Sequence, residues 1–144
     1  MSQGLLFPSK EWAEEFCKKL NENPDYRNAA RTWEGSIMFL ATDLPPSIAE
    51  KYGRGMAGFV LDLYHGECRG SRWAEDPEEA EADYILEATY ENWKKVISGQ
   101  LGPIPALMSR KLKVKKGSLA VLIRYSAAAL AMVKTAQKVP SVFG

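Results

Sequence analysis

A strongly apolar segment near position 100 is interrupted by residues that break helices, and this combination limits the folds open to the chain. The interruptions are two glycines and two prolines, namely Gly99, Gly102, Pro103 and Pro105. Together they exclude one long regular helix. Apolar side chains nevertheless continue through the same stretch, at Leu101, Ile104, Leu107 and Met108. We therefore expect a short, broken apolar element here.

Regular elements flank this segment on both sides. Before it, Trp93, Val96 and Ile97 are spaced to form one apolar face of a short helix, which follows a strand over residues 83–90. After it, apolar and basic residues alternate in the order Lys111, Leu112, Lys113, Val114 and Lys115. This alternation predicts a half-buried strand whose lysines point outward.

The order of these elements resembles the sterol-binding domain of the sterol carrier protein-2 type. Members of that family carry an aromatic-led helix, a Gly-x-Leu turn, a Pro-containing apolar helix and a Gly-Lys-Leu-Lys-Ile-x-Gly strand. The matching residues here are Trp93, Gly99-Gln100-Leu101, residues 103–108, Lys111-Leu112-Lys113-Val114 and Gly117. Two positions depart from the pattern. Arg110 stands where glycine is more usual, and Lys115-Lys116-Gly117 is one residue longer than the common form.

The resemblance implies a stand-alone, prokaryotic-like member with one lipid-binding domain over residues 1–144. Its fold would be α+β, with about five mostly antiparallel strands and helices on one face enclosing a hydrophobic cavity. No catalytic residue, metal or cofactor is expected. The residues expected to contact a ligand are Tyr90, Trp93, Val96, Ile97, Leu101, Ile104, Leu107, Met108, Leu122, Tyr125 and Met132.

The remaining elements can be read from local patterns. Ser9 and Asn23 are suitable N-caps for two successive helices, the second with Pro24 in its first turn. Strands are predicted over residues 35–41, 59–65 and 68–73, with a hairpin turn at Gly66. Residues 35–41 are apolar on both faces, which indicates a strand covered on two sides. One continuous helix is predicted over residues 118–138.

Composition agrees with an ordinary globular protein, since 46% of the 144 residues are hydrophobic and 26% are charged. Cys17 and Cys68 are too few and too irregular for a disulfide framework, so we expect reduced thiols. No signal peptide is evident. The longest apolar run, residues 118–133, is short for a membrane span and contains Arg124. These features favour a cytoplasmic protein.

Charge is distributed unevenly along the chain. Residues 1–91 carry all 18 acidic residues and a net charge of −9, whereas residues 92–144 carry only basic ones and a net charge of +10. The simplest explanation is that the two parts pair within one domain. The alternative is a basic face that meets an anionic membrane or an anionic ligand head group. Binding of nucleic acid is disfavoured because no exposed aromatic residues are interleaved with the basic residues.

Three other motifs are weak evidence for a functional site. Residues 53–58 match Gly-x-Gly-x-x-Gly, but they lead into a strand, whereas a dinucleotide site opens a helix. His65 and Cys68 are too few for a metal site. Asp83 and Glu87 lie on a polar strand face without companion groups, so they are not expected to act as acid and base.

The resemblance implies a protein that binds lipids, either fatty acyl or sterol-like, with transfer of the bound lipid as a further expectation. Two alternatives stay open. The apolar residues can be ordinary core, or they can form a groove that receives a segment of a partner protein. An enzyme acting on acyl compounds has the least support because no nucleophile stands beside a base.

Overall fold

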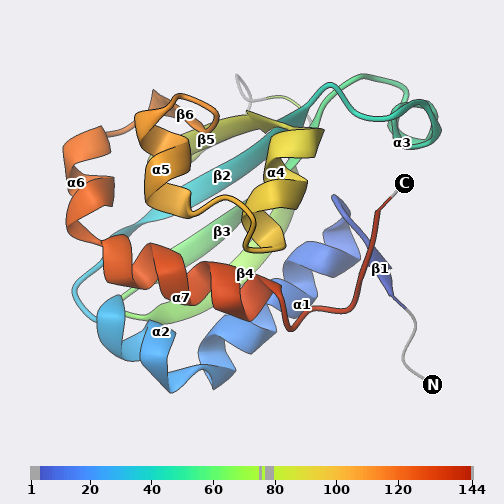
Figure 1. Cartoon of the computed structure of the whole chain (residues 1–144). Helices are drawn as coiled ribbons and strands as arrows, with labels where there is room; N and C mark the ends of the chain where they lie inside the picture. The colour runs from blue at the N-terminus through green and yellow to red at the C-terminus, as the bar shows by residue number, and fades with distance from the viewer. Residues whose placement is uncertain (1–3, 75, 77–79, 144) are drawn as a thin grey trace.

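The computed structural model describes residues 4–74, 76 and 80–143. Its main sheet has five strands in the order β4-β3-β2-β5-β6 (Figure 1). These strands are β2 (Glu34–Thr42), β3 (Ala57–Tyr64), β4 (Glu67–Ala74), β5 (Tyr84–Thr89) and β6 (Lys113–Lys116). Only β2 and β5 run parallel, and the other neighbours are antiparallel. The predicted mostly antiparallel α+β fold is confirmed.

Helices cover one face of this sheet, as Figure 1 shows for α1, α4, α5 and α7. The helices are α1 (Lys10–Glu22), α2 (Pro24–Ala29), α3 (Pro46–Tyr52), α4 (Tyr90–Ile97), α5 (Pro103–Met108), α6 (Leu119–Arg124) and α7 (Ser126–Ala136). Residues 118–138 therefore do not form the single helix predicted from sequence. The backbone leaves the helical region at Tyr125 (φ −99°, ψ 33°), whose hydroxyl is held by Thr32.

The first two helices begin at the predicted caps. The Ser9 hydroxyl accepts a hydrogen bond from the Trp12 N–H at 3.0 Å. The Asn23 side chain accepts hydrogen bonds from the N–H groups of Asp25 and Tyr26. In each case a side-chain oxygen satisfies donors that a helix leaves unpaired in its first turn.

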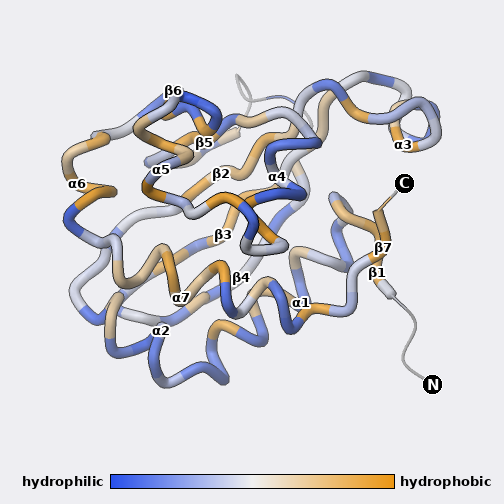
Figure 2. Tube along the Cα trace, in the orientation of Figure 1, coloured by the Kyte–Doolittle hydropathy of each residue, from blue (hydrophilic) through white to orange (hydrophobic). Residues whose placement is uncertain are grey.

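The strand β2 is buried on both faces, as its sequence predicted. Ile37 and Phe39 face the helices, where Ile37 belongs to the main hydrophobic core and the partly buried Phe39 packs against it. Met38 and Leu40 face the opposite side. There they form a smaller apolar cluster with Val60, Ala82 and Ile85. Figure 2 shows hydrophobic positions along the central strands and many hydrophilic ones on α1 and α2.

A short parallel pair of strands that sequence analysis did not predict joins the two ends of the described chain. Leu5–Leu6 (β1) pairs with Ser141–Val142 (β7). The Trp12 indole N–H donates to the Ser141 hydroxyl at 2.7 Å. Pairs of two residues are too short to be recognised from alternation.

The two cysteines form a disulfide, so the expectation of reduced thiols was wrong. Cys17 on α1 and Cys68 on β4 are bonded, with their Cα atoms 5.4 Å apart. Packing of α1 against the edge strand β4 brings together two residues that are 51 positions apart. The expected cytoplasmic location rested partly on reduced thiols and loses that support.

Candidate functional site

A cavity of about 110 Å³ lies between the sheet and the helices. Its walls come from the segment before α1, from α1, α2, β2, β3, β5 and α4 to α7, and from the residues that join some of these elements. The lining residues are Phe7, Trp12, Phe16, Tyr26, Ala30, Trp33, Ile37, Phe39, Phe59, Leu86, Trp93, Val96, Ile97, Pro103, Leu107, Leu112, Leu122, Tyr125, Ala128, Ala129, Met132, Val133 and Ala136. Every one is apolar or aromatic, and none carries a charge.

Stacked and edge-on aromatic rings form the sheet side of this cavity. Phe39 on β2 stacks on Phe59 of β3, with ring centroids 5.3 Å apart. Trp93 on α4 meets Phe39 edge-on at 5.8 Å, and Trp12 on α1 approaches Phe59 at the same distance. Side chains alternate along a strand, so Phe39 can face the helices while Met38 faces away.

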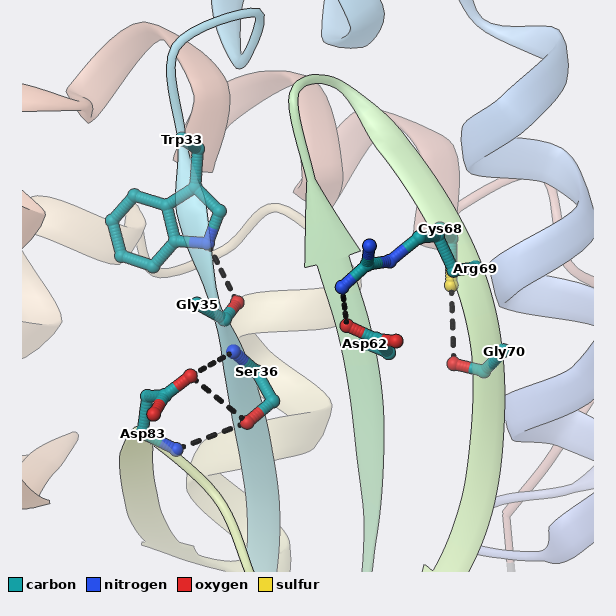
Figure 3. A network of polar contacts seen from close by, with 8 residues as sticks. All are labelled: Trp33, Gly35, Ser36, Asp62, Cys68, Arg69, Gly70 and Asp83. Carbon is teal, nitrogen blue, oxygen red and sulfur yellow. Dashed lines mark hydrogen bonds and ion pairs between the residues drawn. The ribbon is translucent and has the colours of Figure 1, made fainter.

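Another aromatic pair, Trp33 and Tyr125, also lines the cavity. These rings meet edge-on, with centroids 5.0 Å apart. The Trp33 indole N–H donates to the Gly35 carbonyl at 2.8 Å, which Figure 3 shows beside a second pair of residues. In that pair Ser36 and Asp83 exchange hydrogen bonds and join the starts of β2 and β5. The bond to Gly35 holds the Trp33 ring in place against the cavity.

The α6–α7 break brings both helices to the same cavity. Leu122 comes from α6, whereas Ala128 and Met132 come from α7. A single straight helix through Tyr125 would keep α6 and α7 on one common axis. The change of direction at Tyr125 allows α6 to turn back over the cavity.

The predicted ligand-contact residues divide into two groups. Those that line the cavity are Trp93, Val96, Ile97, Leu107, Leu122, Tyr125 and Met132. Tyr90 is buried outside it, near the rings of Phe7 and Phe143, and Leu101 and Ile104 are only partly buried. Met108 is 65% exposed. Contact of any of these residues with a ligand stays a prediction.

Sequence analysis missed the contribution of the N-terminal half to the cavity. The aromatic lining residues from that half are Phe7, Trp12, Phe16, Tyr26, Trp33, Phe39 and Phe59. Most of these residues lie at the regular spacing of buried helix and strand faces. Periodicity identifies a buried face but cannot tell a filled core from a wall beside open space. The density of large aromatic residues was the only available signal.

The motifs that sequence analysis set aside lie away from this cavity. Gly53 ends α3, and the glycine-rich stretch then leads into β3, as predicted. His65 lies in the β3–β4 turn, with its Nε2 atom 3.5 Å from a Glu34 carboxylate oxygen. Among the described residues, no group of three or more histidine, cysteine or acidic residues is arranged to hold a metal ion.

Exposed apolar and basic side chains occur together on the C-terminal part of the chain. Met108, Leu119, Ile123 and Leu130 are exposed apolar residues of this region. Exposed basic residues nearby in sequence are Arg110, Lys111, Lys113, Lys115 and Arg124. Lys115 differs from Lys111 and Lys113 because its Nζ atom lies 3.9 Å from a Glu87 carboxylate oxygen. Over the part of the chain that the structure describes, no helix has the length and apolar character to cross a bilayer.

These features define a class of small α+β protein in which one mixed sheet and its covering helices enclose an apolar cavity. A family model described as the SCP-2 sterol transfer family matches residues 13–129. The chain belongs to that family, as the resemblance around Trp93 and Lys111 predicted.

Solved structures agree with this assignment. A crystal structure of sterol carrier protein 2 is 42% identical, with a TM-score of 0.80 over 91% of this chain and 97% of that chain. A conserved protein of Thermus thermophilus, described as a possible sterol carrier protein, is 40% identical, with a TM-score of 0.82 over 98% and 94%. Sterol carrier protein-2 from Aedes aegypti, in complex with palmitate, shares the fold at 20% identity, with a TM-score of 0.52 over 91% and 98%. No curated protein matches the chain.

Proposed function

We propose that the chain binds a lipid, fatty acyl or sterol-like, in the cavity between sheet and helices, and that it transfers this lipid between membranes. The observation that carries the proposal is the uncharged, aromatic and aliphatic lining of the cavity. Family membership supports it, as does the palmitate complex of the Aedes aegypti protein. Burial of apolar ligand surface would supply the binding energy, at roughly 25 cal/mol per Å².

The volume of the cavity implies that its walls move when a lipid binds. About 110 Å³ is less than the volume of an engineered cavity that accepts benzene, which is roughly 150 Å³. A long acyl chain therefore needs more room than the structure provides. The short helices α5 and α6 contribute Leu107 and Leu122 to the wall, and α5 follows Gly102 and has prolines in its first turn. We propose that these two helices separate from α7 to admit the ligand.

The proposed activity uses no catalytic group, metal or cofactor, so the chain would act as a carrier rather than an enzyme. The buried core around the cavity extends from Phe7 to Val139, which supports one domain over residues 1–144. A cytoplasmic location stays a prediction. The exposed Met108 and Ile123 beside basic residues support peripheral contact with an anionic membrane, where a carrier would load and release its ligand.

Native mass spectrometry of freshly purified protein tests this function most directly. The proposal expects a co-purified lipid mass that an added long-chain lipid displaces. An environment-sensitive fatty-acid probe should also bind and raise the unfolding temperature, because a ligand of the native state stabilises it by mass action. Absence of both the lipid mass and the thermal shift would overturn the proposal. A ligand-free chain that captures a protein segment would favour the interaction domain instead.

A further inference from the structure

Five aromatic residues of the cavity lining carry a polar ring atom or hydroxyl, and four of these groups are hydrogen-bonded within the chain. The Trp12 N–H donates to Ser141 at 2.7 Å, and the Trp93 N–H donates to the Leu40 carbonyl at 2.8 Å. The Trp33 N–H donates to the Gly35 carbonyl at 2.8 Å. The Tyr125 hydroxyl is 2.9 Å from the Thr32 hydroxyl and also donates to the Thr32 carbonyl.

Tyr26 is the fifth residue, and its hydroxyl has no hydrogen-bond partner among residues 4–74, 76 and 80–143. The residue is only 1% exposed, and α2 holds it against the cavity through the Asn23 cap. No fully enclosed side-chain oxygen or nitrogen in the described chain lacks a partner, so the Tyr26 oxygen must keep a small accessible surface. Burial raises the pKa of this hydroxyl, which keeps it a neutral phenol at physiological pH.

A neutral phenol in an apolar wall can donate one hydrogen bond and accept others. Leaving such a group buried without a partner costs free energy, which a ligand that supplies the partner would recover. Because no lysine or arginine lines the cavity, an ionised carboxylate placed there would lose its hydration without gaining an opposite charge. An uncharged oxygen of an alcohol, ketone or ester avoids that cost.

We infer that the Tyr26 hydroxyl is the hydrogen-bonding point for a lipid, and that the cavity selects lipids with an uncharged oxygen over ionised fatty acids. The inference rests on the proposed lipid binding and names the ligand class for the same cavity. A long-chain alcohol would enter with its hydroxyl inward and bond to Tyr26. A fatty acid would leave its carboxylate in water and gain nothing from this residue.

The test compares wild type with Tyr26→Phe and the control Tyr52→Phe, which removes a hydroxyl that lies outside the cavity lining and donates to the Pro8 carbonyl at 2.7 Å. Dodecanol, dodecane and laurate are titrated by displacement of an environment-sensitive fluorescent probe. Tyr26→Phe should weaken dodecanol binding by about twofold to tenfold, the range for one neutral hydrogen bond, and leave dodecane and laurate unchanged. Its ligand-free thermal stability should not fall, because the hydroxyl has no bond to lose and its burial without a partner is unfavourable. Tyr52→Phe should lower thermal stability, because its hydroxyl loses the bond to Pro8, without changing the preference among the three ligands.

A second measurement needs no variant. With tyrosine labelled at Cζ, the Tyr26 resonance should move when dodecanol binds and stay in place with dodecane. The inference is overturned if Tyr26→Phe weakens the binding of dodecanol and dodecane equally, or weakens the binding of neither. It is also overturned if the Tyr26 resonance does not move when dodecanol binds. Binding of dodecane and laurate by the wild type would then still support a lipid carrier. Failure of all three ligands to bind would overturn the proposed function itself.

Discussion

Cys17 on α1 is bonded to Cys68 on β4, and the same helix and strand are joined by hydrogen bonds beside that disulfide. The Asn21 side chain donates to the Cys68 carbonyl at 2.9 Å and accepts from the Cys68 N–H at 2.8 Å. α1 also carries Trp12 and Phe16, which line the cavity. The disulfide thus fixes a cavity wall to the edge of the sheet.

Replacing both cysteines should therefore lower the free energy of unfolding. A cross-link that closes a loop of 51 residues removes chain entropy from the unfolded state, which corresponds to about 4 kcal/mol. We expect the variant Cys17→Ser/Cys68→Ser to lose about 2–4 kcal/mol in urea unfolding. Reductant should destabilise the wild type by a similar amount and leave the double variant unchanged. Free thiols in the folded wild type, with no response to reductant, would contradict this prediction.

Local signals in the sequence were enough to predict much of the fold. Asn23 before Pro24 specified a helix start, and Gly66 specified the β3–β4 turn, where its φ is +81°. These features depend on residues close together in sequence. The disulfide depends instead on the register of α1 over β4, which places Cys17 beside Cys68. No pattern of spacing within a chain that has two cysteines contains that information.

The cavity was predictable only in part for a similar reason. Trp93 and Leu107 were found because they lie in the segment that resembles the family. Tyr26 and Phe59 lie on faces that look like ordinary core. Met108 lies next to Leu107, but it is the last residue of the short helix α5 and is exposed at the surface. One residue of helical rotation separates a lining position from an exposed one.

The N-cap of α1 should matter more than the N-cap of α6. Ser9 is buried and accepts from the Trp12 N–H at 3.0 Å, whereas Ser118 is exposed and accepts from the Val121 N–H at 3.3 Å. We expect Ser9→Ala to cost about 1–2 kcal/mol and Ser118→Ala about 0.5 kcal/mol in urea unfolding. Equal losses would mean that burial of the Ser9 cap adds nothing to its effect.

Neighbouring positions on α5 offer a direct test of the cavity. Leu107→Trp places a larger side chain in the cavity, so binding of a fatty-acid probe should fall about tenfold while the fold survives. Met108→Trp is the matched control at an exposed position and should change neither binding nor stability by more than about 0.5 kcal/mol.

Leu61→Trp completes that comparison. Leu61 is fully buried in the sheet core away from the cavity lining, so overpacking there should cost about 1–3 kcal/mol of stability. If Leu107→Trp destabilises the chain as much as Leu61→Trp does, the segment around α5 is solid core. If Met108→Trp impairs binding as much as Leu107→Trp does, the loss of binding does not come from filling the cavity. Ligand titration and urea unfolding of the three variants distinguish these cases.

The exposed lysines near α5 should govern association with anionic membranes. Each basic residue near such a surface contributes about 1 kcal/mol, and the attraction decays over a Debye length of about 10 Å at 0.1 M salt. We expect the wild type to sediment with vesicles that contain anionic lipid at low salt, and to dissociate at high salt. Lys111→Gln/Lys113→Gln should weaken this association by about 2 kcal/mol. Lys115→Gln should have a smaller effect because Glu87 already lies beside Lys115.

Lys18→Gln/Lys51→Gln is the matched control, because it removes the same charge from α1 and α3 at exposed positions. This control should bind vesicles as the wild type does, and all variants should keep their affinity for a soluble fatty-acid probe. Equal weakening by both double variants would mean that net charge alone governs association. Loss of probe affinity in Lys111→Gln/Lys113→Gln, with vesicle binding unchanged, would instead assign these lysines to the ligand's head group.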